Sequence, residues 1–163
     1  MTRALAEPAV RLLVARPAEP YAELVARARV ASAGTDAPRT SRSYCFPYAV
    51  LAWHTGRVGV DLERVAPCDM AFARLVCTPR ERAHLAGRPV GAHDALLTSL
   101  WSGKEAMAKA AGDARRYEPS RLDAPLLWPG HRAGRWRARS LTGLPPGHVG
   151  WLVWAEAGPD ASE

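Results

Sequence analysis

The sequence has 163 residues, 48% of them hydrophobic and 23% charged, which is enough for one domain with a sizeable core and too apolar for a disordered chain. The net charge of +6 indicates an acidic ligand or partner, but no run of five or more basic residues points to nucleic acid. The three cysteines include no CxxC pair, which argues against a disulfide framework, and the five histidines lack the spacing of a zinc site. The sequence has no long apolar run and no signal-peptide pattern, which argues against a membrane span. We therefore expect a cytoplasmic protein with no membrane or nucleic-acid partner.

The N-terminal part is predicted to contain a strand, a helix and a loop. Alternating apolar residues over 10–15 predict the strand. The helix is predicted to open with Pro20 at its first position and to run to about Val30, because apolar residues follow helical spacing there. Residues 31–40 have the composition of a loop.

A hairpin is predicted next. The apolar stretch Tyr44–Trp53 is predicted to be one strand, at an edge or with a bulge because it contains Pro47. A turn at Thr55-Gly56 would return the chain as a second strand over 57–62.

Asp61 and Glu63 stand at the end of that second strand. They are two residues apart, so both carboxylates are predicted to point to one face while Leu62 points to the other. Two adjacent like charges need a cation or solvent to neutralise their repulsion. The pair is therefore either part of a cation site or an ordinary solvated strand end.

Helices are predicted to follow. A short one spans 69–76, and Thr78 with Glu81 forms a capping box that gives Glu81 a structural role. The main helix is predicted from Gly91 or Ala92 to Ala111, with Gly112 as its C-cap.

The C-terminal part is predicted to be mostly β structure. A short strand is expected over 126–128, and a strand with a basic outer face over 135–140. A third strand, over 149–155, is expected in the centre of a sheet because it is apolar on both faces. Residues 157–163 are predicted to be a frayed terminus.

The middle of the main helix carries a distinctive row. Trp101, Glu105 and Lys109 recur every four residues and share one face. Lys104 and Lys109 are the two lysines of a chain whose other basic residues are arginines, which suggests a need for ammonium groups. The alternative is that Glu105 and Lys109 form a plain surface ion pair.

Taken together, Asp61, Glu63 and Glu105 supply three carboxylates from a strand end and a helix. Oxygen ligands without nearby His or Cys suit Mg²⁺, with Mn²⁺ as the alternative, and a lysine beside such an ion would stabilise charge on a leaving phosphate. The residues therefore predict metal-dependent chemistry on a phosphate or diphosphate.

Two motifs carry a family resemblance. Gly59-Val60-Asp61-Leu62-Glu63 is similar to G-x-D-x-E, and the run from Trp101 to Lys109 is similar to W-x-x-K-E-A-x-x-K. In this order they resemble the paired motifs of the 4′-phosphopantetheinyl transferases, over roughly residues 41–112. The resemblance implies an α+β fold, an antiparallel sheet packed against a long central helix, in a single domain over 1–163. It also implies transfer of 4′-phosphopantetheine from coenzyme A to a serine of an acyl or peptidyl carrier protein.

The resemblance also assigns roles to residues. Asp61, Glu63 and Glu105 would hold Mg²⁺ against the diphosphate of coenzyme A, and Glu105 would be the base for the carrier serine. Lys109 would steady the departing 3′,5′-ADP. Lys104 would contact a phosphate or support the site.

The chain departs from the family pattern in two places. Ser41-Arg42-Ser43 stands where larger members have Ser-His-Ser, so Arg42 and Ser43 would contact a coenzyme A phosphate, unless Arg42 is only a loop arginine. The 58 residues before Gly59 are too few for the full first half of a two-half enzyme, so we expect a homo-oligomer, a trimer rather than a dimer.

The basic surface allows further interpretations. Arg135, Arg137 and Arg139 would either meet an acidic carrier protein or form a solvated strand face. The rival functions are a non-enzymatic relative that binds coenzyme A or a carrier protein, and a basic nucleic-acid-binding domain.

Overall fold

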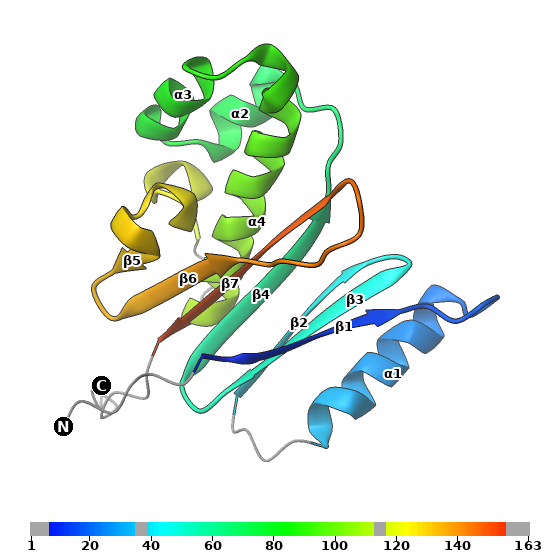
Figure 1. Cartoon of the computed structure of the whole chain (residues 1–163). Coiled ribbons are helices and arrows are strands. Elements are labelled where there is room, and N and C mark those ends of the chain that lie inside the picture. Colours follow the sequence, from blue (N-terminus) through cyan, green and yellow to red (C-terminus); the bar gives the residue numbers. More distant parts are fainter. Residues whose placement is uncertain (1–6, 35–38, 113–116, 156–163) are drawn as a thin grey trace.

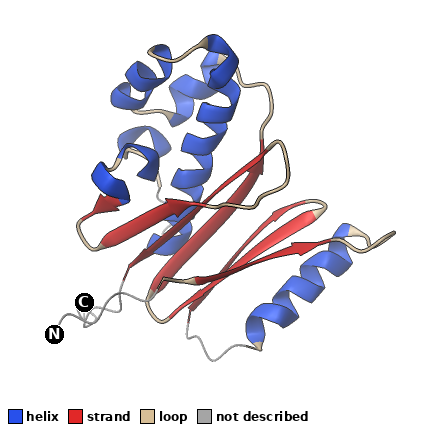
Figure 2. Cartoon of the chain, viewed as in Figure 1, coloured by secondary structure: helices blue, strands red, loops and turns tan. Residues whose placement is uncertain are grey.

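The computed structural model describes residues 7–34, 39–112 and 117–155, and shows two antiparallel sheets enclosed by helices (Figure 1). The first sheet has the strand order β1-β3-β2 and the second β4-β7-β6-β5. Helix α1 covers the outer face of the first sheet and α4 the outer face of the second, so the layers run helix, sheet, sheet, helix (Figure 2). The main elements are β1 (Ala9–Val14), α1 (Tyr21–Ala33), β2 (Arg39–Cys45), β3 (Tyr48–His54), β4 (Arg57–Arg64), α2 (Met70–Val76), α3 (Pro79–Ala86), α4 (His93–Ala111), β5 (Arg132–Ala133), β6 (Trp136–Ser140) and β7 (His148–Ala155).

The two halves repeat one topology. In the first, a strand, a helix and two further strands follow in the order β1, α1, β2, β3, and the last strand lies between the other two. In the second, β4, α4, β6 and β7 do the same, with β7 between β4 and β6. The premise that the N-terminal residues are too few for a first half was therefore wrong. A 13-residue helix and a tight turn between β2 and β3 are sufficient.

The first helix is longer than its sequence pattern predicted. It begins at Tyr21, with Pro20 as its N-cap rather than its first helical residue, and ends at Ala33. The predicted loop over 31–40 was thus wrong at both ends, because α1 enters it and β2 begins at Arg39. Residues 35–38 of that loop lie outside the described part of the chain.

The predicted hairpin was wrong. Tyr44–Trp53 is not one strand, because the chain turns at the cis peptide bond between Phe46 and Pro47, and Pro47 has no N–H with which to continue a ladder. Strand β3 pairs on both sides, with β1 and β2, and so has no free edge for β4. Strand β4 pairs with β7 instead.

The core has a central layer between the sheets and an outer layer under each long helix. Side chains from β3, β4 and β7 fill the space between the sheets, among them Val50, Val60 and Leu152. Helix α1 buries Leu24 against β3, and α4 packs small residues such as Ala106 on β7. Strand β4 therefore has one face toward the first sheet and the other toward α4.

Most of the second half follows its local patterns. Thr78 and Glu81 form a capping box at the start of α3. Helix α4 ends at Ala111, and Gly112 caps it in the left-handed conformation at φ 77°. Strand β7 is central, as predicted. The predicted strand over 126–128 was wrong, because a 3₁₀ turn at Pro125–Leu127 occupies it and a proline without an N–H begins that turn. The terminus predicted over 157–163 lies outside the described residues. Among the described helices, none has the length and apolar character needed to cross a membrane.

Candidate active site

The two halves meet along β2 and β4, where serine hydroxyls of β2, rather than backbone carbonyls, accept the backbone N–H groups of β4. The Ser41 Oγ accepts the Val60 N–H at 3.0 Å, and the Ser43 Oγ accepts the Leu62 N–H at 3.2 Å. Because both bonds join residues nineteen positions apart, the two strands run parallel at this seam. Ser43, which the family resemblance places at a coenzyme A phosphate, is buried between the two strands.

Asp61 is the centre of the site. It is 3% exposed and points to the α4 side of β4, while Leu62 lies in the core between the sheets. Its Oδ1 accepts from the Ser43 hydroxyl at 2.9 Å and from the Lys109 ammonium at 2.7 Å. Lys109 also donates to the Val60 carbonyl at 3.2 Å. The other oxygen, Oδ2, is buried and has no hydrogen-bond partner among the described residues.

Glu63 and Glu105 lie within electrostatic reach of Asp61. Burial, followed by the Asp61 charge, raises the pKa of Glu63 to about 7, against the opposing effects of a hydrogen bond from Trp101 and the charge of Lys109. Burial and then Asp61 also raise the pKa of Glu105, which Lys109 lowers. The strand pattern and the four-residue helix spacing therefore placed these side chains correctly on facing surfaces.

The acidic cluster does not form a closed metal site. Within the described ranges, no group of three or more His, Cys, Asp or Glu side chains is arranged to hold a metal ion. Lys109 contacts the Asp61 carboxylate where a metal would compete with it. The donors still suit a hard cation. Asp61 offers a buried oxygen without a partner among the described residues, and positive charge would relieve the repulsion from Asp61 that adds to burial in raising the pKa of both glutamates.

Lys104 lies apart from the carboxylates, which corrects the expectation that it contacts a phosphate. Its side chain is fully buried, and its ammonium group pairs with Glu81 at 2.6 Å. It also donates to the carbonyls of Val76 and Pro119. Being one residue from Glu105, it points about 100° around the helix, toward α3 rather than β4. The alternative expectation, that Lys104 supports the site without touching a phosphate, remains open.

A basic cavity opens beside Lys109. It has a volume of about 450 Å³ and lies between α1 and β2 of the first half and β4 and α4 of the second. Arg29, Arg42 and Lys109 contribute positive charge to its lining. Arg42 is exposed and donates to the Ser32 Oγ at 2.6 Å. Arg29 was not among the predicted site residues, because the sequence shows it only as one basic residue on the predicted amphipathic helix.

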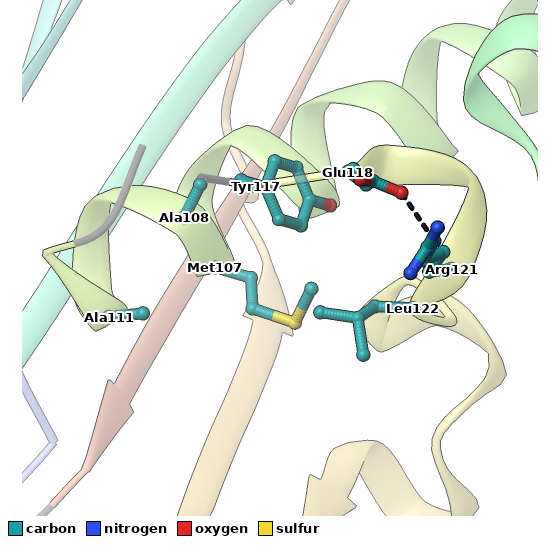
Figure 3. Close-up of a pocket in the computed structure, with 7 residues that line it drawn as sticks. All are labelled: Met107, Ala108, Ala111, Tyr117, Glu118, Arg121 and Leu122. Carbon is teal, nitrogen blue, oxygen red and sulfur yellow. Dashed lines mark ion pairs between the residues drawn. The ribbon is translucent and has the colours of Figure 1, made fainter. Parts of the chain in front are cut away.

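An apolar cavity of about 410 Å³ lies along the same helix. Met107 and Ala111 of α4 form one side, and Tyr117 and Leu122 form the other; the side chains of Met107 and Leu122 point toward each other across it (Figure 3). The ion pair of Glu118 and Arg121 gives it a charged rim. Burial, with smaller contributions from the charges of Glu81 and Glu105, raises the pKa of the Tyr117 hydroxyl. Sequence analysis did not predict this cavity.

Comparison with known proteins agrees with the motifs. The chain is 35% identical over 84 residues to the 4′-phosphopantetheinyl transferase psf-1 of Bacillus pumilus, an alignment that covers 52% of this chain and 36% of the relative. The chain thus matches little more than a third of that relative's length. A family profile described as the 4′-phosphopantetheinyl transferase superfamily matches residues 57–144, which include both motifs and more than half of the chain. The chain therefore belongs to the 4′-phosphopantetheinyl transferase superfamily.

Proposed function

We propose that this protein, as a single domain over residues 1–163, transfers 4′-phosphopantetheine from coenzyme A to a serine of an acyl or peptidyl carrier protein in a Mg²⁺-dependent reaction. The observation that carries the proposal is the acidic cluster of Asp61, Glu63 and Glu105, which lies beside Lys109 at the seam between the two halves. A basic cavity and an apolar cavity adjoin the same helix.

Asp61, Glu63 and Glu105 would hold the cation, Mg²⁺ or alternatively Mn²⁺. The Oδ2 of Asp61, which finds no hydrogen-bond partner in the described part of the chain, and the raised pKa values of both glutamates support this assignment. When bound, the ion would neutralise charge on the diphosphate of coenzyme A. Lys109 would then exchange its contact with Asp61 for the phosphate group of the departing 3′,5′-ADP.

The basic cavity would bind the phosphates of coenzyme A. Arg29, Arg42 and Lys109 meet there from both halves, and the cavity has a volume suited to part of a nucleotide. An arginine can bind phosphate through two parallel hydrogen bonds, so Arg42 would serve where relatives have histidine. The apolar cavity would hold the pantetheine arm, the least charged part of coenzyme A.

Glu105 would accept the proton of the carrier serine. A raised pKa brings a carboxylate closer to the working pH and makes it a better base, provided that it remains ionised. Lys109 is 30% exposed, so its ammonium group is within reach of a ligand, unlike that of Lys104.

The carrier protein would meet a basic surface. Complementary charge would mainly increase the association rate. Arg135, Arg137 and Arg139 each already have a partner. Arg135 lies over Trp136, Arg137 donates to nearby carbonyls, and Arg139 lies 3.5 Å from Glu7, just before β1. These contacts favour the solvated-face interpretation, and the charge change R137E would test it through the salt dependence of carrier association.

A single chain would supply both sides of the seam. Since the first half is complete in topology, we propose a monomer in place of the trimer or dimer expected from chain length. Light scattering of the active protein distinguishes these states, and activity confined to an oligomer would restore the original expectation.

The second candidate is a non-enzymatic relative that binds coenzyme A or a carrier protein. Arg42, which stands where larger members of the family have histidine, favours it. It predicts coenzyme A binding without group transfer.

Intact-protein mass spectrometry of an apo carrier protein with coenzyme A and Mg²⁺ separates the two candidates. We expect the carrier to gain one phosphopantetheine, and to lose this gain with EDTA or with Glu105→Gln. The matched control is Glu23→Gln, which neutralises an exposed carboxylate on α1. Coenzyme A binding without any gain across several carrier classes would favour the non-enzymatic relative.

A further inference from the structure

The buried ion pair of Lys104 and Glu81 has no place in the chemistry proposed above. Both side chains are 0% exposed, and their charged atoms are 2.6 Å apart. Removing two charges from water is unfavourable, so such a pair persists only where its other hydrogen bonds are also satisfied. Lys104 meets this condition, because its three donors reach Glu81 and the carbonyls of Val76 and Pro119, at 2.8 and 2.6 Å.

Glu81 extends the connection to further segments. Its Oε2 accepts the Thr78 N–H at 2.8 Å within the capping box, and its Oε1 accepts the Ala124 N–H at 2.6 Å. The pair thus joins the end of α2, the start of α3, the middle of α4 and the segment 117–124. Only the bond from the Thr78 N–H is needed to cap α3, so capping does not account for the other contacts of Glu81.

The segment 117–124 forms one wall of the apolar cavity. It contains a single 3₁₀ turn, Pro119–Arg121, and otherwise has no regular structure. The ion pair fixes its backbone at two points, the Pro119 carbonyl and the Ala124 N–H, on either side of Leu122. A third link joins Thr78 Oγ1 to Asp123 at 2.6 Å. Leu122 itself is 52% exposed, so its own packing contributes little to holding the wall in place.

We propose that Lys104 and Glu81 are positioning residues that hold the 117–124 wall against α4 and so set the affinity for the pantetheine arm. The inference rests on the proposed function, because it needs that arm in the apolar cavity. Neither side chain touches the ligand. The lysine of the helix motif therefore acts on substrate binding from a side of α4 about 100° around the helix from Glu105.

The test uses the double variant K104M/E81Q, which removes both charges with little change in side-chain volume. The single amide oxygen of the new glutamine can accept the Thr78 N–H, which keeps the cap of α3, while the Ala124 N–H of the wall loses its acceptor. Isothermal titration gives the Kd of coenzyme A and that of 3′,5′-ADP, which lacks the arm. We expect the Kd of coenzyme A to rise at least tenfold while that of 3′,5′-ADP stays within twofold. In steady-state assays, KM for coenzyme A should rise with kcat nearly unchanged.

L122A tests the wall without disturbing the ion pair. It should also weaken coenzyme A binding selectively, and its effect should be smaller in the K104M/E81Q background, because a displaced wall no longer presents Leu122 to the arm. If circular dichroism shows K104M/E81Q to be unfolded, E81Q alone carries the comparison. Its one amide oxygen can serve the Thr78 N–H or the Ala124 N–H but not both, and Lys104 loses its charged partner.

The outcomes separate the inference from the proposed function. Equal weakening of both ligands, or no weakening of either, overturns the positioning role. An unchanged Kd for coenzyme A in L122A overturns the location of the arm. Wild-type protein that binds neither ligand overturns the proposed function itself.

Discussion

Gly59 is where α4 approaches β4 too closely for any side chain. A Cβ at this position would lie 1.9 Å from the Ala106 carbonyl oxygen and 2.5 Å from the Ala110 nitrogen, both backbone atoms of α4. Ordinary contact begins at 3.4 Å, so Gly59→Ala requires a displacement of about 1.5 Å, the difference between 3.4 and 1.9 Å. No rotamer change relieves the clash, because both atoms belong to a helix backbone.

The displacement has two measurable consequences. Overpacking of this kind costs about 1–3 kcal/mol, and at about 2–4 °C per kcal/mol the Tm should fall by roughly 2–12 °C. In addition, α4 carries Glu105 and Lys109 while β4 carries Asp61 and Glu63. A misplacement of about 1 Å costs about 10²-fold in rate, so carrier modification should fall by that order even where the variant is folded.

The assay pairs thermal denaturation, followed by circular dichroism, with carrier modification at 25 °C. Gly91→Ala is the matched control, because an added Cβ there meets nothing within 4 Å. It should leave both the Tm and the rate close to those of the wild type. A Gly59→Ala variant that behaves like Gly91→Ala in both measurements would refute the close approach and, with it, the explanation of the motif glycine.

Three further predictions concern the acidic cluster. The pKa of Glu63 is about 7 in the folded protein against 4.5 ordinarily, so the folded state binds more protons between these values, and stability falls as pH rises through that window. Without divalent cations, Glu63→Gln should therefore melt above the wild type at about pH 8 and level with it at about pH 4, below both pKa values, and parallel Tm curves would contradict this. Ser43→Ala leaves the buried Leu62 N–H without an acceptor, which should cost about 1–3 kcal/mol in urea unfolding, and a smaller loss would mean that water replaces the hydroxyl. Lys109→Met removes the cation at Asp61 Oδ1, so it should tighten Mg²⁺ binding in titration while lowering carrier modification by at least about tenfold; weaker Mg²⁺ binding would show that Lys109 does not compete with the metal.

The sequence by itself determined the local geometry of the site. The period of two along β4 puts Asp61 and Glu63 on one face, and the four-residue spacing along α4 puts Trp101, Glu105 and Lys109 on another. These rules depend only on backbone repeat, so they hold wherever the element is placed. The capping box at Thr78 was predictable for the same reason, because both of its partners lie within one turn.

Strand pairing and partners distant in sequence were decided by the tertiary structure. The apolar pattern of β3 and β4 suits a hairpin, yet β3 already pairs on both edges and β4 pairs with β7, about ninety residues later in the chain. The pattern records which face is buried and carries no information on which strand covers which edge.

The two lysines of the helix motif show the same limit. One residue of helical rotation separates Lys104 from the face of Glu105, and the fold places Glu81 opposite it and Asp61 opposite Lys109. From the sequence, both were candidates for phosphate contact. Their roles diverge because an ammonium group is held by the oxygens that surround it, and only the packing of α4 between β4 and α3 determines which oxygens those are.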